Sequence, residues 1–227
     1  MAAKRQEDFI GSFAHELKTP LTSMIGYADM LRSREMSEEE RFLAANYIFK
    51  EGKRLEALSL KLLELLVVRH QEMERKTVPI KWLAEDIEGI LRPSLEKTGI
   101  ELKVLVEEAY LHLEPDLMKT VLLNLLDNGR KAIEGKGILI LMGRREKKGY
   151  TLYVKDSGKG MPQVEISRIT EAFYMIDKSR ARQQGGAGLG LSLCAEIIKR
   201  HHGTLEFQSI EGEGTIAKVF LPGEVTV

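Results

Sequence analysis

The sequence predicts a protein of two parts, an α-helical hairpin that dimerises into a four-helix bundle and an α/β domain that follows it. Three observations predict this architecture. Apolar residues recur with helical heptad spacing over residues 1–75, whereas short apolar runs alternate with helix-like segments over residues 76–227. The stretch at 74–79 marks the boundary between the two patterns. We therefore expect one domain to cover residues 1–75 and a second to cover residues 76–227.

The first helix is predicted from a seam of apolar residues that step alternately by four and by three. This spacing is typical of a helix packed in a bundle. Polar residues at 32–35 then interrupt the pattern. The members of the seam are Ile10, Ala14, Leu17, Leu21, Met24, Ala28 and Leu31.

A second helix is predicted to begin after Ser37, because Ser37 and Glu40 have the spacing of a capping box. Leucines resume the three-four spacing from Leu55 to Leu65, and we expect the helix to run to about Glu74. The short connection predicts an antiparallel hairpin. Since one hairpin can bury little of its seam by itself, dimerisation into a four-helix bundle is expected.

The second part of the chain predicts an α/β domain with six strands and three long helices. A turn at 211–214 would join the last two strands. The predicted helices are 82–98, 115–134 and 189–202, the last ended by Gly203. The predicted strands are 77–80, 100–106, 137–144, 150–155, 204–209 and 214–221.

Composition excludes several classes of function. Lysine plus arginine and aspartate plus glutamate both total 34, so no overall charge draws the protein to nucleic acid or to an anionic membrane. A single cysteine, Cys194, excludes an internal disulfide framework and a cysteine cluster for metal. No apolar run approaches the about 20 residues that span a bilayer. We expect a soluble, cytoplasmic protein.

Two glycine-rich elements indicate a phosphate or nucleotide site. Residues 185–191, Gly-Gly-Ala-Gly-Leu-Gly-Leu, open directly into a predicted helix, where bare backbone amides and a positive helix end favour an anion. Asp156 begins the second element, Asp-Ser-Gly-Lys-Gly, and its carboxylate could accept a hydrogen bond from an adenine amino group. Taken singly, each element is equally compatible with an ordinary turn or lid.

A predicted helix carries two asparagines, Asn124 and Asn128, one turn apart on one face. An amide oxygen is a suitable hard ligand for Mg²⁺, a cation that uses few protein groups when it also bridges phosphates. Two solvent-facing polar residues would give the same pattern.

Together and in this order, these elements resemble the N, G1, F and G2 boxes of the histidine-kinase ATP-binding domain. The upstream segment 13–22, Phe-Ala-His-Glu-Leu-Lys-Thr-Pro-Leu-Thr, resembles the H box of the same family. The resemblance covers nearly the whole chain. It implies a sensor histidine kinase catalytic core, in which a dimerisation and phosphoacceptor hairpin precedes a two-layer α/β sandwich of the Bergerat or GHKL type.

The resemblance also implies a role for individual residues. Asn128 would be the Mg²⁺ ligand, Asn124 and Lys131 would lie near the phosphates, and Asp156 would read adenine. Gly158 and Gly160 would let the base approach. Phe173 would be the aromatic anchor at one end of a mobile lid. The lid and the path of the triphosphate would be formed by Gly186, Gly188, Leu189 and Gly190.

The sequence departs from the family pattern around the F box. Ala172 stands where the family often has proline, and Met175 stands where a basic residue often follows the aromatic pair. A cation near the γ-phosphate would then have to come from Lys178, Arg180 or Arg182.

His15 is predicted to be the phosphoacceptor. It falls just off the heptad seam and therefore faces solvent, as an acceptor must. Glu16 could hold the proton of one ring nitrogen while the other attacks phosphorus. Thr19 lies one turn further along, where the family uses this position to hydrolyse the phosphorylated partner. Pro20 lacks the amide that would bond the Glu16 carbonyl, so a hinge or a simple kink is expected.

The function implied is ATP-dependent autophosphorylation of His15 and phosphoryl transfer to an aspartate of a response-regulator receiver, with phosphatase activity toward that regulator. ATP and Mg²⁺ are the implied cofactors, and a homodimer is the implied assembly. Most relatives are anchored at the inner face of the membrane by an upstream region. Two alternatives stay open, an ATPase clamp of the gyrase type and a degenerate, non-catalytic dimeric scaffold.

Overall fold

The computed structural model describes residues 2–70, 72–177 and 188–224. Their packing divides into two compact units, Met1–Leu66 with Glu171–Leu189, and Val67–Thr170 with Gly190–Val227.

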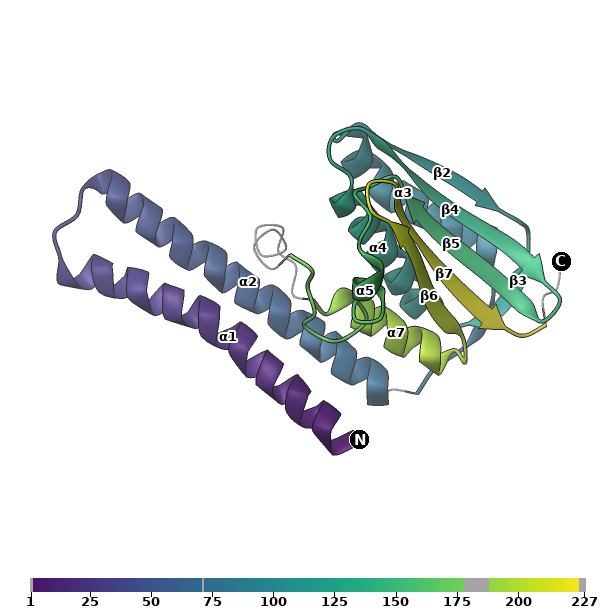
Figure 1. The fold of residues 1–227 in the computed structure, drawn as a ribbon, viewed down its shortest axis with the longest axis horizontal. Helices are drawn as coiled ribbons and strands as arrows, with labels where there is room; N and C mark the ends of the chain where they lie inside the picture. Colours follow the sequence, from purple (N-terminus) through teal and green to yellow (C-terminus); the bar gives the residue numbers. More distant parts are fainter. Residues whose placement is uncertain (1, 71, 178–187, 225–227) are drawn as a thin grey trace. The chain divides into compact units, whose positions relative to one another are not determined.

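Two long helices dominate the first unit, α1 (Ala2–Ser33) and α2 (Glu38–His70), which form a hairpin (Figure 1). The predicted capping box is confirmed, because the Ser37 backbone amide donates to the Glu40 carboxylate and the Glu40 amide donates to the Ser37 hydroxyl. The α2 helix ends at His70 rather than at the predicted Glu74. Residues 72–75 have no regular structure, since the apolar three-four spacing that supports the helix has already stopped.

Pairs of residues across the hairpin fix its antiparallel register. The Tyr27 and Tyr47 rings stack with centroids 4.7 Å apart, and Arg54 on α2 bonds Glu16 on α1. The α1 helix continues without interruption through Pro20, although proline has no amide hydrogen to donate within the helix.

The second unit is a two-layer α/β sandwich, as predicted. Its main sheet has the strand order β2-β4-β5-β7-β6, in which only the β2–β4 pair is parallel. Helices α3, α4 and α7 cover one face of this sheet (Figure 1). The strands of the main sheet are β2 (Ile100–Val106), β4 (Gly137–Glu146), β5 (Gly149–Asp156), β6 (Thr204–Ile210) and β7 (Gly214–Pro222).

A second, two-stranded antiparallel sheet pairs β1 (Lys76–Pro79) with β3 (Tyr110–Leu113). The sequence reading missed β3, and it also missed the four-residue helix α5 (Gln163–Ile166). The long helices are α3 (Ile80–Glu96), α4 (Pro115–Ala132) and α7 (Gly190–Arg200). Their apolar sides and the inner face of the sheet form one continuous core, which includes Leu83, Ile87, Met118, Val121, Leu126, Leu139, Leu141, Leu152 and Ile197.

Gly203 was predicted to end the last helix, but the structure gives the left-handed position at the end of α7 to another residue. The residue with a left-handed backbone is His202, at φ 59°, and the Gly203 amide bonds the Ile198 carbonyl. A Cβ at Gly203 would lie 2.3 Å from the Phe220 carbonyl oxygen. Glycine is therefore needed there for the close approach of β7 and not for its conformational freedom.

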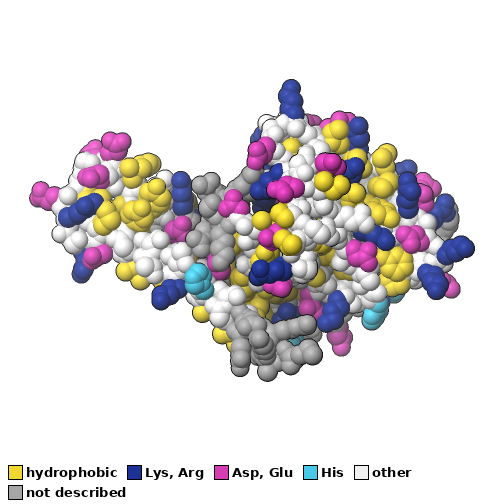
Figure 2. Space-filling model, in the orientation of Figure 1, with side chains coloured by type: hydrophobic (Ala, Val, Ile, Leu, Met, Phe, Trp, Pro, Cys, Tyr) yellow, Lys and Arg dark blue, Asp and Glu magenta, His cyan; other side chains and the backbone are white. Residues whose placement is uncertain are grey.

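The surface mixes charges of both signs, as the sequence predicts. Figure 2 shows lysine and arginine side chains interspersed with aspartate and glutamate over the visible face. Across the described residues, no helix combines the length and the apolar character needed to cross a membrane.

Candidate functional site

Helix α4 carries the predicted asparagines on the side away from the core. Residues such as Leu122, Leu125 and Leu126 are buried, whereas Asn124 is half-buried and Asn128 is exposed. The Glu114 side chain caps the helix by accepting from the Leu117 amide. The helix period thus places both amide groups on one accessible face.

Asn124 lies against the start of α7. Its side-chain nitrogen donates to the Thr120 carbonyl at 2.8 Å, which leaves the amide oxygen directed elsewhere. A Cβ built on Gly190, the first residue of α7, would be 2.9 Å from that oxygen. Glycine at this position therefore lets α4 and the amino terminus of α7 meet, where the helix dipole favours an anion.

Lys131 is paired with a carboxylate of its own helix. Its ammonium lies 2.8 Å from Asp127, which also holds Arg130 at 2.7 Å. Burial raises the pKa of Asp127, but the hydrogen bonds and charges of Lys131 and Arg130 outweigh burial and lower the pKa overall. Asp127 thus stays ionised and holds the Lys131 ammonium at the end of α4.

Asp156 ends β5 and is 6% exposed. Its carboxylate accepts a hydrogen bond of 2.8 Å from the Gly158 amide. Burial raises the pKa of Asp156, and backbone hydrogen bonds from Gly158 and Thr215 partly oppose that rise. A buried acceptor with few partners is suited to a specific hydrogen bond with a bound base.

Glycines pack closely around Asp156. A Cβ on Gly129 would lie 2.7 Å from the Leu139 side chain and 3.1 Å from the Asp156 Cβ. Gly158 approaches Ala132 at the end of α4, where a Cβ would come within 2.7 Å. Gly160 has φ 61°, and its Cβ would overlap the Ile210 carbonyl. These glycines are therefore required by the fold around the carboxylate itself.

The donors present fit a magnesium ion that arrives with phosphates. In the part of the chain that the structure describes, no cluster of three or more His, Cys, Asp or Glu could bind a metal by itself. An exposed amide such as that of Asn128 supplies one hard oxygen ligand, and phosphate oxygens and water would complete the coordination.

Phe173 and Gly188 belong to the first unit and are bonded to each other. The Phe173 amide donates to the Gly188 carbonyl at 2.8 Å, and Phe173 has the unusual φ of 66°. The Phe173 ring contacts Phe9 and Phe13 of α1, with centroids 5.3 and 6.1 Å apart. Leu189 is buried. The predicted residues Lys178, Arg180, Arg182 and Gly186 lie outside the described residues.

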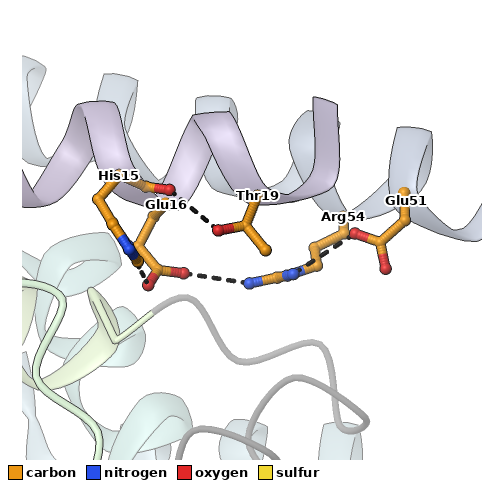
Figure 3. Close-up of polar contacts among 5 residues, drawn as sticks. All are labelled: His15, Glu16, Thr19, Glu51 and Arg54. Carbon is orange, nitrogen blue, oxygen red and sulfur yellow. Dashed lines mark hydrogen bonds and ion pairs between the residues drawn. The ribbon is translucent and has the colours of Figure 1, made fainter. Parts of the chain in front are cut away.

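His15 projects from α1 with 66% of its side chain exposed, as predicted (Figure 3). Its Nδ1 lies 3.7 Å from Glu16 Oε1, which is longer than a hydrogen bond. The Thr19 hydroxyl donates to the His15 carbonyl at 3.3 Å. The three predicted residues of the H box therefore form one group on the first unit.

Sequence reasoning missed the partner of Glu16. The Glu16 carboxylate is almost fully buried, and its Oε2 accepts a hydrogen bond of 3.1 Å from Arg54 on α2 (Figure 3). Arg54 immediately precedes Leu55 of the second apolar seam, but other charged residues of this helix also flank seam leucines, so the sequence does not single it out. Spacing alone does not name a partner 38 residues away.

Comparison with known proteins identifies both parts of the chain. Residues 5–66 match the family model of the His Kinase A (phospho-acceptor) domain, and residues 113–225 match that of the histidine kinase-, DNA gyrase B- and HSP90-like ATPases. Among similar proteins, the sensor protein kinase WalK of Staphylococcus saprophyticus is 30% identical over 98% of this chain and 37% of its own length. The sensor histidine kinase YclK of Bacillus subtilis is 31% identical over 96% of this chain and 47% of its own length.

The chain thus spans less than half the length of these two relatives. Among solved structures, the histidine kinase ThkA in complex with the response regulator protein TrrA is 21% identical over 98% of this chain and 65% of that chain, with a TM-score of 0.76. Full-length ShkA in complex with AMPPNP is 23% identical over 96% of this chain and 46% of that chain, with a TM-score of 0.67. At these identities, the structures support the fold.

Proposed function

This chain belongs to the histidine kinase family, and from that premise we propose that it is the catalytic core of a sensor histidine kinase. In this role it uses ATP to phosphorylate His15 and passes the phosphoryl group to an aspartate of a response regulator. The observation that carries the proposal is an exposed histidine beside a buried glutamate, on a hairpin joined to a nucleotide-binding fold. We propose that the boundary between the hairpin domain and the α/β domain lies between residues 75 and 76.

The α/β domain, in this proposal, holds ATP and positions its γ-phosphate. Asp156 accepts a hydrogen bond from the adenine amino group, and the amino terminus of α7 with Asn124 and Lys131 lies along the phosphates. Gly158 and Gly160 shape the wall beside the base, while Phe173, Gly188, Leu189 and Gly190 frame the lid. A magnesium ion bound at Asn128 would neutralise charge that develops on the phosphates.

Phosphoryl transfer to histidine needs positioning and charge neutralisation more than covalent help from the protein. The Nε2 lone pair of His15 forms the new bond to phosphorus, and the bond from phosphorus to the bridging oxygen breaks to release ADP. The proton on Nδ1 passes to Glu16 Oε1, which lies 3.7 Å away before substrate binds. The product is a phosphohistidine whose ring is neutral and whose phosphoryl group is anionic, ready to donate that group to the receiver.

Dimerisation is proposed from the apolar side chains that the hairpin leaves exposed. Such a helical face is unstable in water unless a second copy covers it. Apolar side chains are visible on the hairpin in Figure 2. The exposed residues of α1 and α2 include Ile10, Leu21, Ile25, Leu31, Phe42, Leu43, Phe49, Leu60, Leu63 and Leu66.

The receiver is proposed to dock near His15, and Thr19 is proposed to assist hydrolysis of the phosphorylated receiver by orienting a water molecule. The ThkA complex with TrrA supports a response regulator as the partner class. We propose the cytoplasm as the location of this core, with the rest of the protein able to anchor it at the membrane.

Replacing Thr19 by alanine tests the phosphatase role, because kinase activity should be retained while receiver dephosphorylation falls.

Labelled ATP tests the proposed function. The chain should acquire a label that is labile in acid and stable in base, and His15→Ala should lose it. His70→Ala is a matched control, since His70 is also an exposed histidine on the hairpin. Hydrolysis of ATP without any protein label would instead support the ATPase clamp, and absence of nucleotide binding would support a scaffold. The match to the phospho-acceptor domain disfavours both.

A further inference from the structure

Glu16 is a charged residue in an unusual place. It is 4% exposed, although it lies one position from the solvent-exposed His15. A buried carboxylate is costly unless a partner neutralises it and satisfies its oxygens. The surroundings of Glu16 therefore decide both its charge and the direction in which its two oxygens point.

Arg54 supplies that partner from the other helix of the hairpin. Its side chain is only 13% exposed, and its Nη2 lies 3.1 Å from Glu16 Oε2. The other terminal nitrogen, Nη1, lies 3.4 Å from Glu51 Oε2 (Figure 3). The planar guanidinium is thereby held between two carboxylates, one from each helix.

The two oxygens of Glu16 have separate partners. Oε2 faces Arg54, and Oε1 faces His15 Nδ1. As long as Arg54 holds Oε2, the carboxylate cannot rotate without breaking a charge-assisted hydrogen bond. Oε1 then stays on the Nδ1 side of the ring, where it favours the tautomer that carries its proton on Nδ1 and a lone pair on Nε2.

We propose that Arg54 is a positioning residue for phosphorylation of His15, acting through Glu16, and that Glu51 holds Arg54 in place. This inference rests on the proposed function. Arg54 does not touch the reacting atoms. It neutralises the buried carboxylate and fixes the oxygen that receives the Nδ1 proton as the bond from Nε2 to phosphorus forms.

The matched variants are Arg54→Gln and Lys53→Gln. Each removes one positive charge from the same turn of α2, but Lys53 pairs with Glu56 in an exposed contact and does not face Glu16. Arg54→Lys is the conservative variant, because it keeps the charge but lacks the fork that bridges two carboxylates.

Two measurements separate positioning from a merely structural role. The first is the ¹⁵N spectrum of the His15 ring in the absence of nucleotide, which reports the tautomer. The second is the rate of autophosphorylation at saturating and limiting ATP. Arg54→Gln should shift the tautomer toward the form protonated on Nε2 and lower kcat by about 10- to 100-fold, with KM for ATP changed less than about twofold. Arg54→Lys should restore part of kcat, and Lys53→Gln should match the unaltered protein within about twofold.

Each outcome decides the proposal. A folded Arg54→Gln dimer with unchanged ring signals and unchanged kcat would overturn it. If the unsubstituted protein never acquires label but Arg54→Gln still shifts the His15 tautomer, the positioning role is supported and the kinase assignment is refuted. If Arg54→Gln does not fold, Glu51→Gln replaces it. That variant should produce the same ring shift and about a threefold loss of kcat, and no change in either would count against the proposal.

Discussion

The helical hairpin and the α/β unit bury their apolar residues to different degrees. Helices α3, α4 and α7 and the sheet enclose a continuous core, in which residues such as Leu126 and Leu139 have no measurable exposure. In the hairpin, Leu58 and Leu65 are buried, but Leu21, at half exposure, and many other apolar side chains face solvent. The α/β unit therefore encloses its own core, whereas the hairpin leaves apolar side chains exposed that the proposed dimer would cover.

The polar residues of the two regions also differ in what holds them in place. In the α/β unit, Asp156 and its glycines are fixed by packing contacts that tolerate no added atom. In the hairpin, the exposed His15 lies beside an ion pair between Glu16 and Arg54, on which we propose that its orientation depends. The comparison suggests a division of roles: the proposed nucleotide site is built into a closely packed fold, while the proposed phosphoacceptor sits among contacts between the two helices.

The largest effect is expected for Asn128→Ala in the α/β unit. Loss of the amide that would hold the magnesium ion should lower autophosphorylation by on the order of 100-fold or more. Because Asn128 is exposed, the free energy of unfolding should change by less than about 0.5 kcal/mol. Dimerisation should persist in sedimentation experiments. Normal labelling in this variant would remove the magnesium assignment.

A charge on the exposed seam of the hairpin should separate the dimer. Leu21 is 50% exposed in the single chain, and Leu21→Glu would place a carboxylate in the proposed interface. We expect the dissociation constant to rise by about 100-fold, as measured by sedimentation or light scattering. Val164→Glu is the matched control, since Val164 is 74% exposed on α5 of the other unit. Equal effects of the two substitutions would contradict the comparison.

Asp156→Asn should weaken nucleotide binding without loss of stability. Burial raises the pKa of Asp156 above its ordinary value, so the folded state binds its proton more tightly than the unfolded state does. Its contribution to stability therefore falls as the pH rises through the window between the ordinary and the raised pKa. A neutral asparagine removes this cost, and the unfolding temperature should stay equal or rise at neutral pH.

The same substitution replaces the carboxylate acceptor of the adenine amino group, so ATP affinity should fall by about 10- to 100-fold. Calorimetric titration with ATP and thermal unfolding at pH 5 and pH 8 measure the two effects. The stability difference between variant and parent should shrink at the lower pH. Retained affinity for ATP would show that Asp156 does not read the base.

The smallest effect is expected at the turn of the hairpin. Ser37→Ala removes the hydroxyl that accepts from the Glu40 amide, and loss of such a cap costs about 1 kcal/mol. The effect should appear in unfolding of the hairpin and leave ATP affinity unchanged. A comparable loss of ATP affinity would indicate that the two regions are not energetically separate.

Local signals in the sequence predicted much of the fold. The capping box at Ser37 located the start of α2, and the predicted strand 100–106 coincides with β2. The four-residue strand β3 was missed because so short a run carries little periodicity, and its pairing with β1 joins residues more than 30 positions apart. The end of α2 was overextended because residues 71–74 include no glycine or proline that would mark a stop.

The candidate site was predictable where local motifs define it and not where it depends on distant contacts. Asn124, Asn128 and Asp156 could be named from helix spacing and from the end of a strand. The burial of Glu16 could not, because it depends on Arg54 from the opposite helix. Glycine at 158 and 160 was expected because a bound base would have to approach closely. The structure gives a further reason, since Ala132 lies close to Gly158 and the Ile210 carbonyl lies close to Gly160.

The most direct test of the central claim is to locate the phosphoryl group after incubation with Mg·ATP. Mass spectrometry of peptides prepared at alkaline pH, which preserves phosphohistidine, should find the modification on His15, and Asn128→Ala should lack it. A phosphoryl group on another residue, or an unmodified His15 in a chain that binds and hydrolyses ATP, would contradict the account.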